Sequence, residues 1–209
     1  MKFERFVQVV RRFELEDGFA DILYLEAIRK LEEVRKDYQK LNERIARRII
    51  RPFLANWGRM GRNVERQDFD WQLLVEVIKN QRGNLDKLRR ETILDVRLGE
   101  VTSIIKAVFD GMKVRQLGPT GISKVLHLLN PELFVMWDLD IRRKINDKSF
   151  SASSRGYFDF LRWIQSELIE ATAGRIIDEI RDEVGGEYID EKTLAKLADE
   201  YCWRTAREK

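Results

Sequence analysis

The spacing of apolar residues in this chain is helical almost from end to end. Ile49, Phe53 and Trp57 recur every four residues, and similar spacing returns in segments 160–168 and 176–180. Apolar residues at such intervals form one face of an α-helix, whereas strands need a two-residue alternation that no segment here sustains. We therefore predict an all-α protein of about ten helices with no significant sheet.

Few residues interrupt this helical pattern. The 209 residues include only three prolines and twelve glycines, and no repeat or flexible linker divides them. We expect residues 1–209 to form a single compact helical domain, built as one unit or as two lobes. Pro52 lies inside an apolar stripe, so the pattern predicts a kink or a helix boundary near Arg51.

The chain has one cysteine, Cys202, and one histidine, His127. A disulfide framework, a four-thiolate iron–sulfur cluster and a cysteine-rich zinc site are therefore excluded, and a Ser-His-Asp hydrolase is disfavoured. We predict no metal site. We expect His127 to pack or to form a hydrogen bond in the interior, and Cys202 to be buried.

No stretch is long and apolar enough to cross a membrane, and the first residues lack the apolar core of a signal peptide. These features predict a cytoplasmic protein without a membrane partner.

Charge is distributed unevenly along the chain, although 39 Lys+Arg against 36 Asp+Glu leave a net charge of only +3. Residues 44–66 hold seven arginines and one acid, whereas residues 167–209 hold twelve acids and seven bases. A basic segment opposite an acidic one favours an oriented encounter with a polyanion. Alternatively, the arginines meet the acidic segment inside the fold.

One segment stands out from this background. Residues 114–126 have the sequence Val-Arg-Gln-Leu-Gly-Pro-Thr-Gly-Ile-Ser-Lys-Val-Leu, and an apolar helical pattern precedes them. A tight turn at Leu117-Gly118 is followed by Pro119, which suits the first turn of a new helix. The pattern predicts two helices joined by a turn over residues 101–129.

This segment resembles the helix-hairpin-helix of the HhH-GPD superfamily of DNA glycosylases, whose hairpin has the form Leu-Pro-Gly-hydrophobic-Gly. The second glycine falls on Gly118, while Arg115 and Gln116 stand where the family has proline and the first glycine. The resemblance implies that backbone amides of the hairpin hold a DNA phosphate, with a monovalent cation there and no other cofactor. An ordinary helical corner closed by Gly118 is the alternative.

Asp138 extends the resemblance to residues 100–145. The family carries an aspartate at this separation after the second glycine, with an apolar and a basic residue at the places of Ile141 and Arg143. In the family this carboxylate stabilises the positive charge that grows on the deoxyribose as the base leaves, and it orients or deprotonates the nucleophile. The alternative role is to cap the following helix, and both roles can coexist.

The resemblance also bears on the nucleophile. Bifunctional members place a lysine two residues after the second hairpin glycine, where this chain has Thr120. Lys124 lies about 6 Å further along the helix axis, a displacement that makes a Schiff base with it the less favoured alternative. Water as the nucleophile, or no catalysis at all, is what the sequence favours.

The loop of residues 57–62 mixes Trp57 with two glycines and with Arg59 and Arg62. Such a loop can lie beside a flipped base or along phosphates. Alternatively, Trp57 ends the core face of its helix and the arginines are exposed. Trp137 is a weak candidate for a wall of a base pocket, and we expect Asp140 to lie on the surface.

The sequence therefore predicts a helix-hairpin-helix protein that binds double-stranded DNA, with monofunctional base excision by Asp138 and water as the leading hypothesis. A DNA-binding module without catalysis and a helical protein-interaction protein remain the alternatives. The predicted DNA contacts are Arg59, Arg62, Arg115, Gly118, Thr120, Gly121 and Lys124, with Trp57 and Trp137 near the base.

Overall fold

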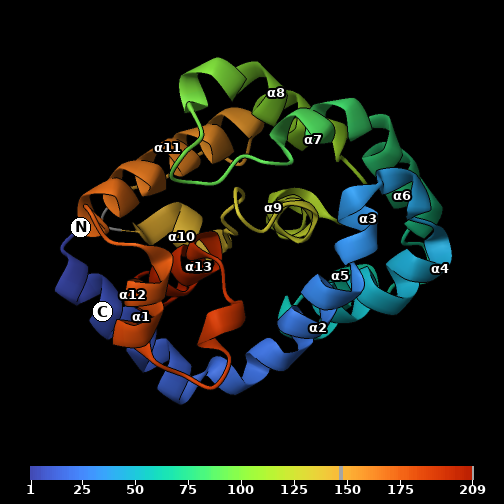
Figure 1. Ribbon diagram of the computed structural model, residues 1–209. Helices are drawn as coiled ribbons and strands as arrows, with labels where there is room; N and C mark the ends of the chain where they lie inside the picture. Colours follow the sequence, from blue (N-terminus) through green and yellow to red (C-terminus); the bar gives the residue numbers. More distant parts are fainter. Residues whose placement is uncertain (146–147, 209) are drawn as a thin grey trace.

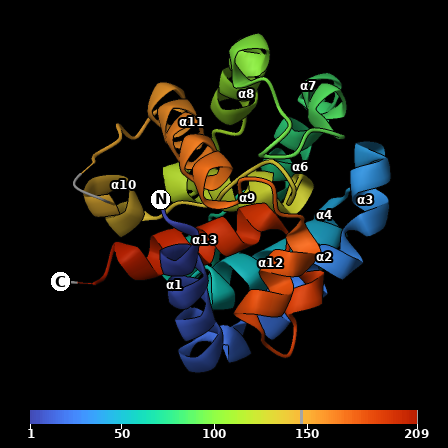
Figure 2. The same ribbon diagram turned by 60° about the vertical axis from the view of Figure 1, so that its left-hand side comes forward.

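The computed structural model describes residues 1–145 and 148–208, and within them it contains helices and turns but no strand. The predicted all-α class is confirmed. Figure 1 shows the helices arranged around a central one, and Figure 2 shows the same molecule turned by 60°. The helices of the described residues are more numerous than predicted, because several apolar stretches are divided into short consecutive helices.

Thirteen α-helices are present in the described part of the chain: α1 (Phe3–Glu16), α2 (Ile22–Lys30), α3 (Glu32–Lys36), α4 (Glu43–Ile45), α5 (Gly61–Val64), α6 (Trp71–Asn80), α7 (Arg82–Leu88), α8 (Leu98–Gly111), α9 (Gly118–Leu129), α10 (Leu139–Lys144), α11 (Ser154–Ala171), α12 (Ile177–Val184) and α13 (Leu194–Thr205). Three short 3-10 helices are η1 (Gly18–Asp21), η2 (Tyr38–Lys40) and η6 (Ile189–Glu191), and two π-helical turns are η3 (Ala46–Ile50) and η4 (Phe53–Trp57). Among the residues described, no helix combines the length and the apolar character needed to span a membrane.

Helix α9 lies at the centre of the molecule. All nine residues 121–129 are buried, and Figure 1 shows the helix within a ring of the others. A helix that is apolar on every side is expected in such a position. The polar side chains of Ser123, Lys124 and His127 must therefore find partners inside the protein, and this requirement shapes the site described below.

Pro52 changes the type of helix without ending it. The chain stays helical through Pro52, with the π-helical turns η3 and η4 on either side. Proline has no N–H to donate and its ring crowds the preceding turn, so the hydrogen-bond ladder widens. One such step is the Gly58 N–H donating to the Phe53 carbonyl at 2.7 Å. The helix boundary near Arg51 is therefore absent, and the wide turn carries Trp57 towards α9.

The two ends of the chain pack together. Helix α1 lies against α12 and α13, as Figure 2 shows. The rings of Phe6 and Tyr201 are 5.7 Å apart, and Arg5 pairs with Glu208. The C-terminal helix is thereby fixed beside the N-terminal one.

Polar side chains cap the first turns of several helices. Asp70 accepts a hydrogen bond from the Leu73 amide at 2.8 Å and caps α6, and Asp138 caps α10 in the same way. Each such cap contributes about 1 kcal/mol to stability.

Three arginines of the basic segment 44–66 form ion pairs with acids in or next to that segment. Arg47 pairs with Glu43 at 2.7 Å, and Arg66 pairs with Asp68 at 3.0 Å. Among the residues that the structure describes, no arginine of this segment forms an ion pair with the acidic segment at the C-terminal end. Charge pairing of the two segments inside the fold is therefore not what holds them together.

Candidate functional site

The turn between α8 and α9 has an unusual backbone. Gln116 and Gly118 both have positive φ angles, +70° and +59°. Glycine adopts this left-handed conformation without strain, whereas glutamine pays of order 1 kcal/mol for it. Gln116 stands where the resembled family has its first glycine. Its backbone adopts the left-handed conformation that glycine favours, although the residue is glutamine.

The strained turn is held by the loop before α6. Asn63 donates from Nδ2 to the Gln116 carbonyl at 3.2 Å, and Gln116 donates from Nε2 to Asp68 at 2.9 Å. Asp68 therefore fixes the hairpin turn, while Asp70, two residues later, caps α6. These two contacts fix the start of α9 in space.

Some of the predicted DNA contacts of the hairpin are exposed to solvent, and others are buried. Arg115 and Gly118 are exposed, Thr120 is half-buried, and the space where a Gly118 Cβ would lie is empty. The amides of Gly118 and Thr120 donate to no other backbone carbonyl of the described residues. Gly121 lies inside, where an added Cβ would meet Met60 at 2.8 Å and Leu117 at 2.6 Å.

Asp138 has both carboxylate oxygens engaged. Its Oδ1 accepts from the Ile141 amide at 2.9 Å, and its Oδ2 accepts from Arg207 Nη2 at 2.5 Å. The side chain is 21% exposed, so solvent still reaches it. Asp140, as predicted, lies at the surface, where it pairs with Lys144 at 3.6 Å and with Arg207 at 3.4 Å.

Lys124 points inward from α9 towards the loop after η4. Its Nζ donates to the Gly58 carbonyl at 2.7 Å and lies 5.6 Å from the centre of the Trp57 ring. Burial lowers the pKa of Lys124, and the negative charges of Asp199 and Asp138 offset this only in part. Lys124 is thus a buried amine whose hydrogen-bond acceptor is a backbone carbonyl.

Two arginines complete this cluster from opposite ends of the chain. The guanidinium carbon of Arg59 lies 5.6 Å from the centre of the Trp203 ring, and that of Arg207 lies 4.2 Å from it. The positive charges of both arginines also contribute to lowering the pKa of Lys124. We call Lys124, Asp138, Asp199, Arg59, Arg207 and Trp203 the mixed-charge cluster.

Asp199 lies on the interior side of the mixed-charge cluster. It is 7% exposed, and its only close ionic partner among the described residues is Lys196 at 3.8 Å. Burial raises the pKa of Asp199 to about 6, against the opposing effect of Lys196 and Lys124. A carboxyl group that titrates near neutral pH inside a protein is a candidate acid or base.

Behind this cluster lies a buried ionic network. Lys196 contacts Asp21 at 3.2 Å and Glu200 at 2.6 Å, while Lys192 contacts the same two carboxylates at 2.5 and 2.9 Å and also pairs with Glu14. Burial alone would raise the pKa of Asp21, but the two ammonium groups outweigh it and lower that pKa. These five side chains, the buried network hereafter, join the start of the chain to α13.

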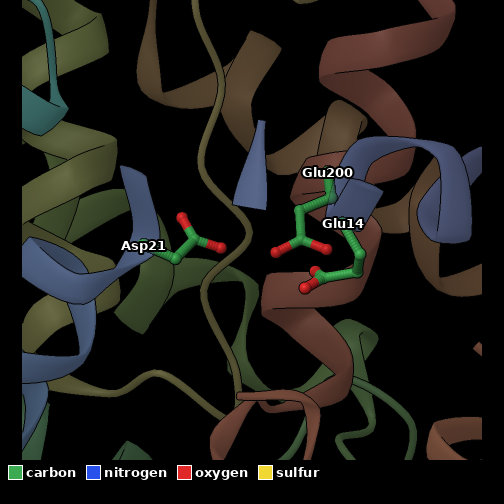
Figure 3. A group of neighbouring side chains, drawn as sticks. All are labelled: Glu14, Asp21 and Glu200. Carbon is green, nitrogen blue, oxygen red and sulfur yellow. The ribbon is translucent and has the colours of Figure 1, made fainter. Parts of the chain in front are cut away.

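The three carboxylates of the buried network have the arrangement of a divalent cation site. Their oxygens lie within 4.8 Å of one another, and Figure 3 shows Asp21 facing Glu14 and Glu200. However, the Lys192 ammonium forms ion pairs with all three carboxylates, so it lies where a metal ion would otherwise bind. We assign no metal to this group.

The buried network holds more carboxylates than ammonium groups. Three carboxylates face two lysines, and Glu200 Oε2 is buried without a hydrogen-bond partner in the described structure. Burial raises the pKa of Glu200 well above its ordinary value, and the two lysines offset this only in part.

Trp57 connects the buried network to the mixed-charge cluster. Its Nε1 donates to Asp21 at 2.8 Å, and its ring lies 5.1 Å from Lys196 and 5.6 Å from Lys124. It also stacks on Phe53, with ring centres 4.9 Å apart. Trp57 is thus a half-buried core residue that touches both groups of charges.

The remaining candidates are interior residues. His127 is buried, with Nε2 2.9 Å from the Tyr24 hydroxyl and Nδ1 2.5 Å from the Phe134 carbonyl, as expected for a hydrogen-bonding role. Burial lowers its pKa to about 3. Trp137 is 1% exposed and donates to the Pro119 carbonyl at 3.3 Å. Cys202 is buried, as predicted.

The sequence analysis did not single out Asp199, Trp203 and Arg207. They follow one another at intervals of four residues, so they share one face of α13 and its extension. That spacing is a signal in the sequence, but only the fold shows that this face meets Asp138 and the loop of Arg59.

Searches against protein-family models, curated proteins and solved structures found no match to this chain.

Replacing Asp199 with asparagine should remove a pH-dependent loss of stability. A carboxyl with a raised pKa contributes fully to stability below its unfolded-state pKa of about 4, and this contribution is lost as the pH rises through about 6. The free energy of unfolding of Asp199→Asn, relative to the parent, should therefore rise by about 2 to 3 kcal/mol between pH 4 and 7.

Urea unfolding at a series of pH values measures this difference. The exposed Asp182→Asn is the matched control, and its difference from the parent should change little. If the Asp199→Asn difference were equally flat, the raised pKa of Asp199 would be wrong.

Proposed function

We propose that this protein binds duplex DNA through the turn between α8 and α9 and excises a base with Asp138. The observation that supports the proposal most directly is the exposed start of α9, where the amides of Gly118 and Thr120 donate to no backbone carbonyl of the described residues. Further along the same helix, Ser123 Oγ lies 3.2 Å from both the backbone N–H and the carbonyl of Trp137, the residue before Asp138. The predicted phosphate-binding turn and the predicted catalytic carboxylate are thereby linked through α9.

Phosphate binding rests on the outer part of the turn. The amides of Gly118 and Thr120 donate to no backbone carbonyl of the described residues and stand at the start of α9. Unpaired amides at a helix N-terminus favour an anion, and the missing Cβ of Gly118 leaves room for a phosphate to approach. The exposed Arg115 and Arg62 add positive charge to the same interface.

In the proposed reaction a damaged base is turned out of the duplex, and the bond between its nitrogen and C1′ of the deoxyribose breaks. The electron pair of that bond leaves with the base. The carboxylate of Asp138 stabilises the positive charge on the sugar and orients the water whose oxygen forms the new bond to C1′, and the proton that this water loses balances the charge of the departing base. Lys124 is held by the Gly58 carbonyl and the Trp57 ring, so water is the nucleophile. The proposed class of activity is DNA repair by a monofunctional glycosylase.

DNA binding without catalysis is the second candidate. It is favoured by the pairing of Asp138 with Arg207 at 2.5 Å, which neutralises the charge that excision would use. In this second candidate function the hairpin and the arginines bind DNA, whereas Asp138 caps α10 and anchors the C-terminal residues without taking part in a reaction.

Replacing Gly118 with asparagine should weaken binding to duplex DNA by about fivefold or more, since one phosphate contact to a helix N-terminus is worth roughly 1 kcal/mol or above. Asparagine tolerates a positive φ, so folding should change little. Fluorescence anisotropy with a labelled duplex measures the affinity.

Gly174→Asn is the matched control, because Gly174 also has a positive φ, +74°, and open space around its Cβ position. If the two variants bound duplex DNA with equal affinity, Gly118 would shape the turn without contacting a phosphate.

Replacing Asp138 with asparagine should leave DNA affinity and folding largely intact while excision falls on the order of 10²- to 10³-fold. Asparagine caps a helix about as well as aspartate but carries no charge for the sugar cation. The release of base from a damaged duplex under single-turnover conditions measures the effect.

The control is Asp140→Asn, which removes a carboxylate that also contacts Arg207. If both variants kept the parent rate, Asp138 would have no part in the chemistry.

A further inference from the structure

Two guanidinium groups share the indole of Trp203. Arg207 lies 4.2 Å from the ring centre and Arg59 lies 5.6 Å from it. Arg207 is balanced by Asp138 and Asp140, whereas Arg59 forms no ion pair or side-chain hydrogen bond with any residue that the structure describes. Arg59 is therefore a cation without an anionic partner of its own in the described structure, on the same ring as Arg207.

The backbone at Arg59 is held in an uncommon conformation by the residues around it. Arg59 has a φ of +53°, which a residue other than glycine adopts only at some cost in free energy. The preceding Gly58 lies so close to the turn before it that an added Cβ would be 2.6 Å from the Leu54 carbonyl oxygen. The Lys124 ammonium in turn holds the Gly58 carbonyl at 2.7 Å. A strained residue kept in place by its surroundings is typical of binding sites.

Trp203 and Arg207 are also firmly placed. The edge of the Trp203 ring packs on Phe13 with ring centres 5.7 Å apart, so the indole cannot easily turn away. Arg207 donates from Nη1 to the Trp203 carbonyl at 2.9 Å and from Nη2 to Asp138. Its Nε–H has no partner in the described structure, and the N–H groups of Arg59 have none either.

We propose that Arg59 and Arg207, stacked on Trp203, bind one phosphate of the DNA backbone next to Asp138. This inference rests on the proposed function, and it adds a second anchor to the one at the hairpin turn. Planar guanidinium groups donate paired hydrogen bonds to phosphate oxygens, and an indole face restricts their orientation.

A short stretch of chain that includes part of α5 joins the two anchors. Arg59 belongs to the second anchor, and Asn63, four residues later, binds the hairpin turn through the Gln116 carbonyl. A single strand that contacts both anchors would pass Asp138, because Arg207 touches Asp138 and Trp203 alike. The phosphate bound by the second anchor is therefore the one beside the sugar that Asp138 faces.

The test measures how the affinity of the full-length protein for a duplex oligonucleotide depends on salt. Each lost phosphate contact lowers the slope of log K against log salt by about 0.9. Because the two arginines share one phosphate, the double variant Arg59→Gln/Arg207→Gln should lower the slope by about 0.9, and each single variant by no more than this amount. Arg59→Lys keeps the charge and should restore the slope.

Trp203→Leu keeps both charges but removes the ring that orients them, so it should weaken affinity with a smaller change of slope. The control is Arg90→Gln: Arg90 is exposed, has no ion-pair partner in the described structure and follows α7, which Figures 1 and 2 show well apart from α13. Urea unfolding of each variant shows whether it remains folded.

The outcomes separate this inference from the proposed function. If the parent binds duplex with a steep slope and Gly118→Asn weakens it, but the Arg59 and Arg207 variants match Arg90→Gln, the second anchor is refuted and the hairpin proposal stands. If the parent does not bind duplex DNA at all, both are refuted.

Discussion

The buried network of Glu14, Asp21, Lys192, Lys196 and Glu200 is the interaction on which the arrangement of this protein depends. Lys192, Lys196, Asp21 and Glu200 are entirely out of contact with solvent. Removing either partner of such an ion pair leaves an uncompensated charge in the interior, at a cost of about 3 to 5 kcal/mol. The network therefore allows only one placement of α13 against η1 and α1.

That placement decides what the outer face of α13 can do. Lys196 and Glu200 enter the buried network, and the face formed by Asp199, Trp203 and Arg207 is thereby turned towards α10 and the loop of Arg59. Trp57 also fixes the position of α9 relative to the buried network. Its ring lies near both Lys196 and Lys124, and its Nε1 donates a hydrogen bond to Asp21. The mixed-charge cluster is consequently a product of the buried network behind it.

The parts of this structure that the sequence could predict are those that depend on near neighbours. The helical class follows from apolar spacing, and the caps by Asp70 and Asp138 follow from residue type and position. The burial of His127 and Cys202 was equally predictable. What could not be predicted are contacts between distant segments, such as Arg207 on Asp138, because nothing local to either residue indicates the other. The same holds for Pro52, whose effect depends on how far the surrounding helix is supported by packing.

The central claim is that Asp138 acts on a deoxyribose beside the hairpin. The most direct measurement is to incubate the unaltered protein with duplexes that each carry one kind of damaged base, and then to treat the products with alkali, which cleaves the strand at abasic sites. The account predicts alkali-dependent cleavage at the damaged position of at least one duplex and no covalent adduct on borohydride reduction, since water is the nucleophile. Tight binding of every duplex without any abasic site would contradict it.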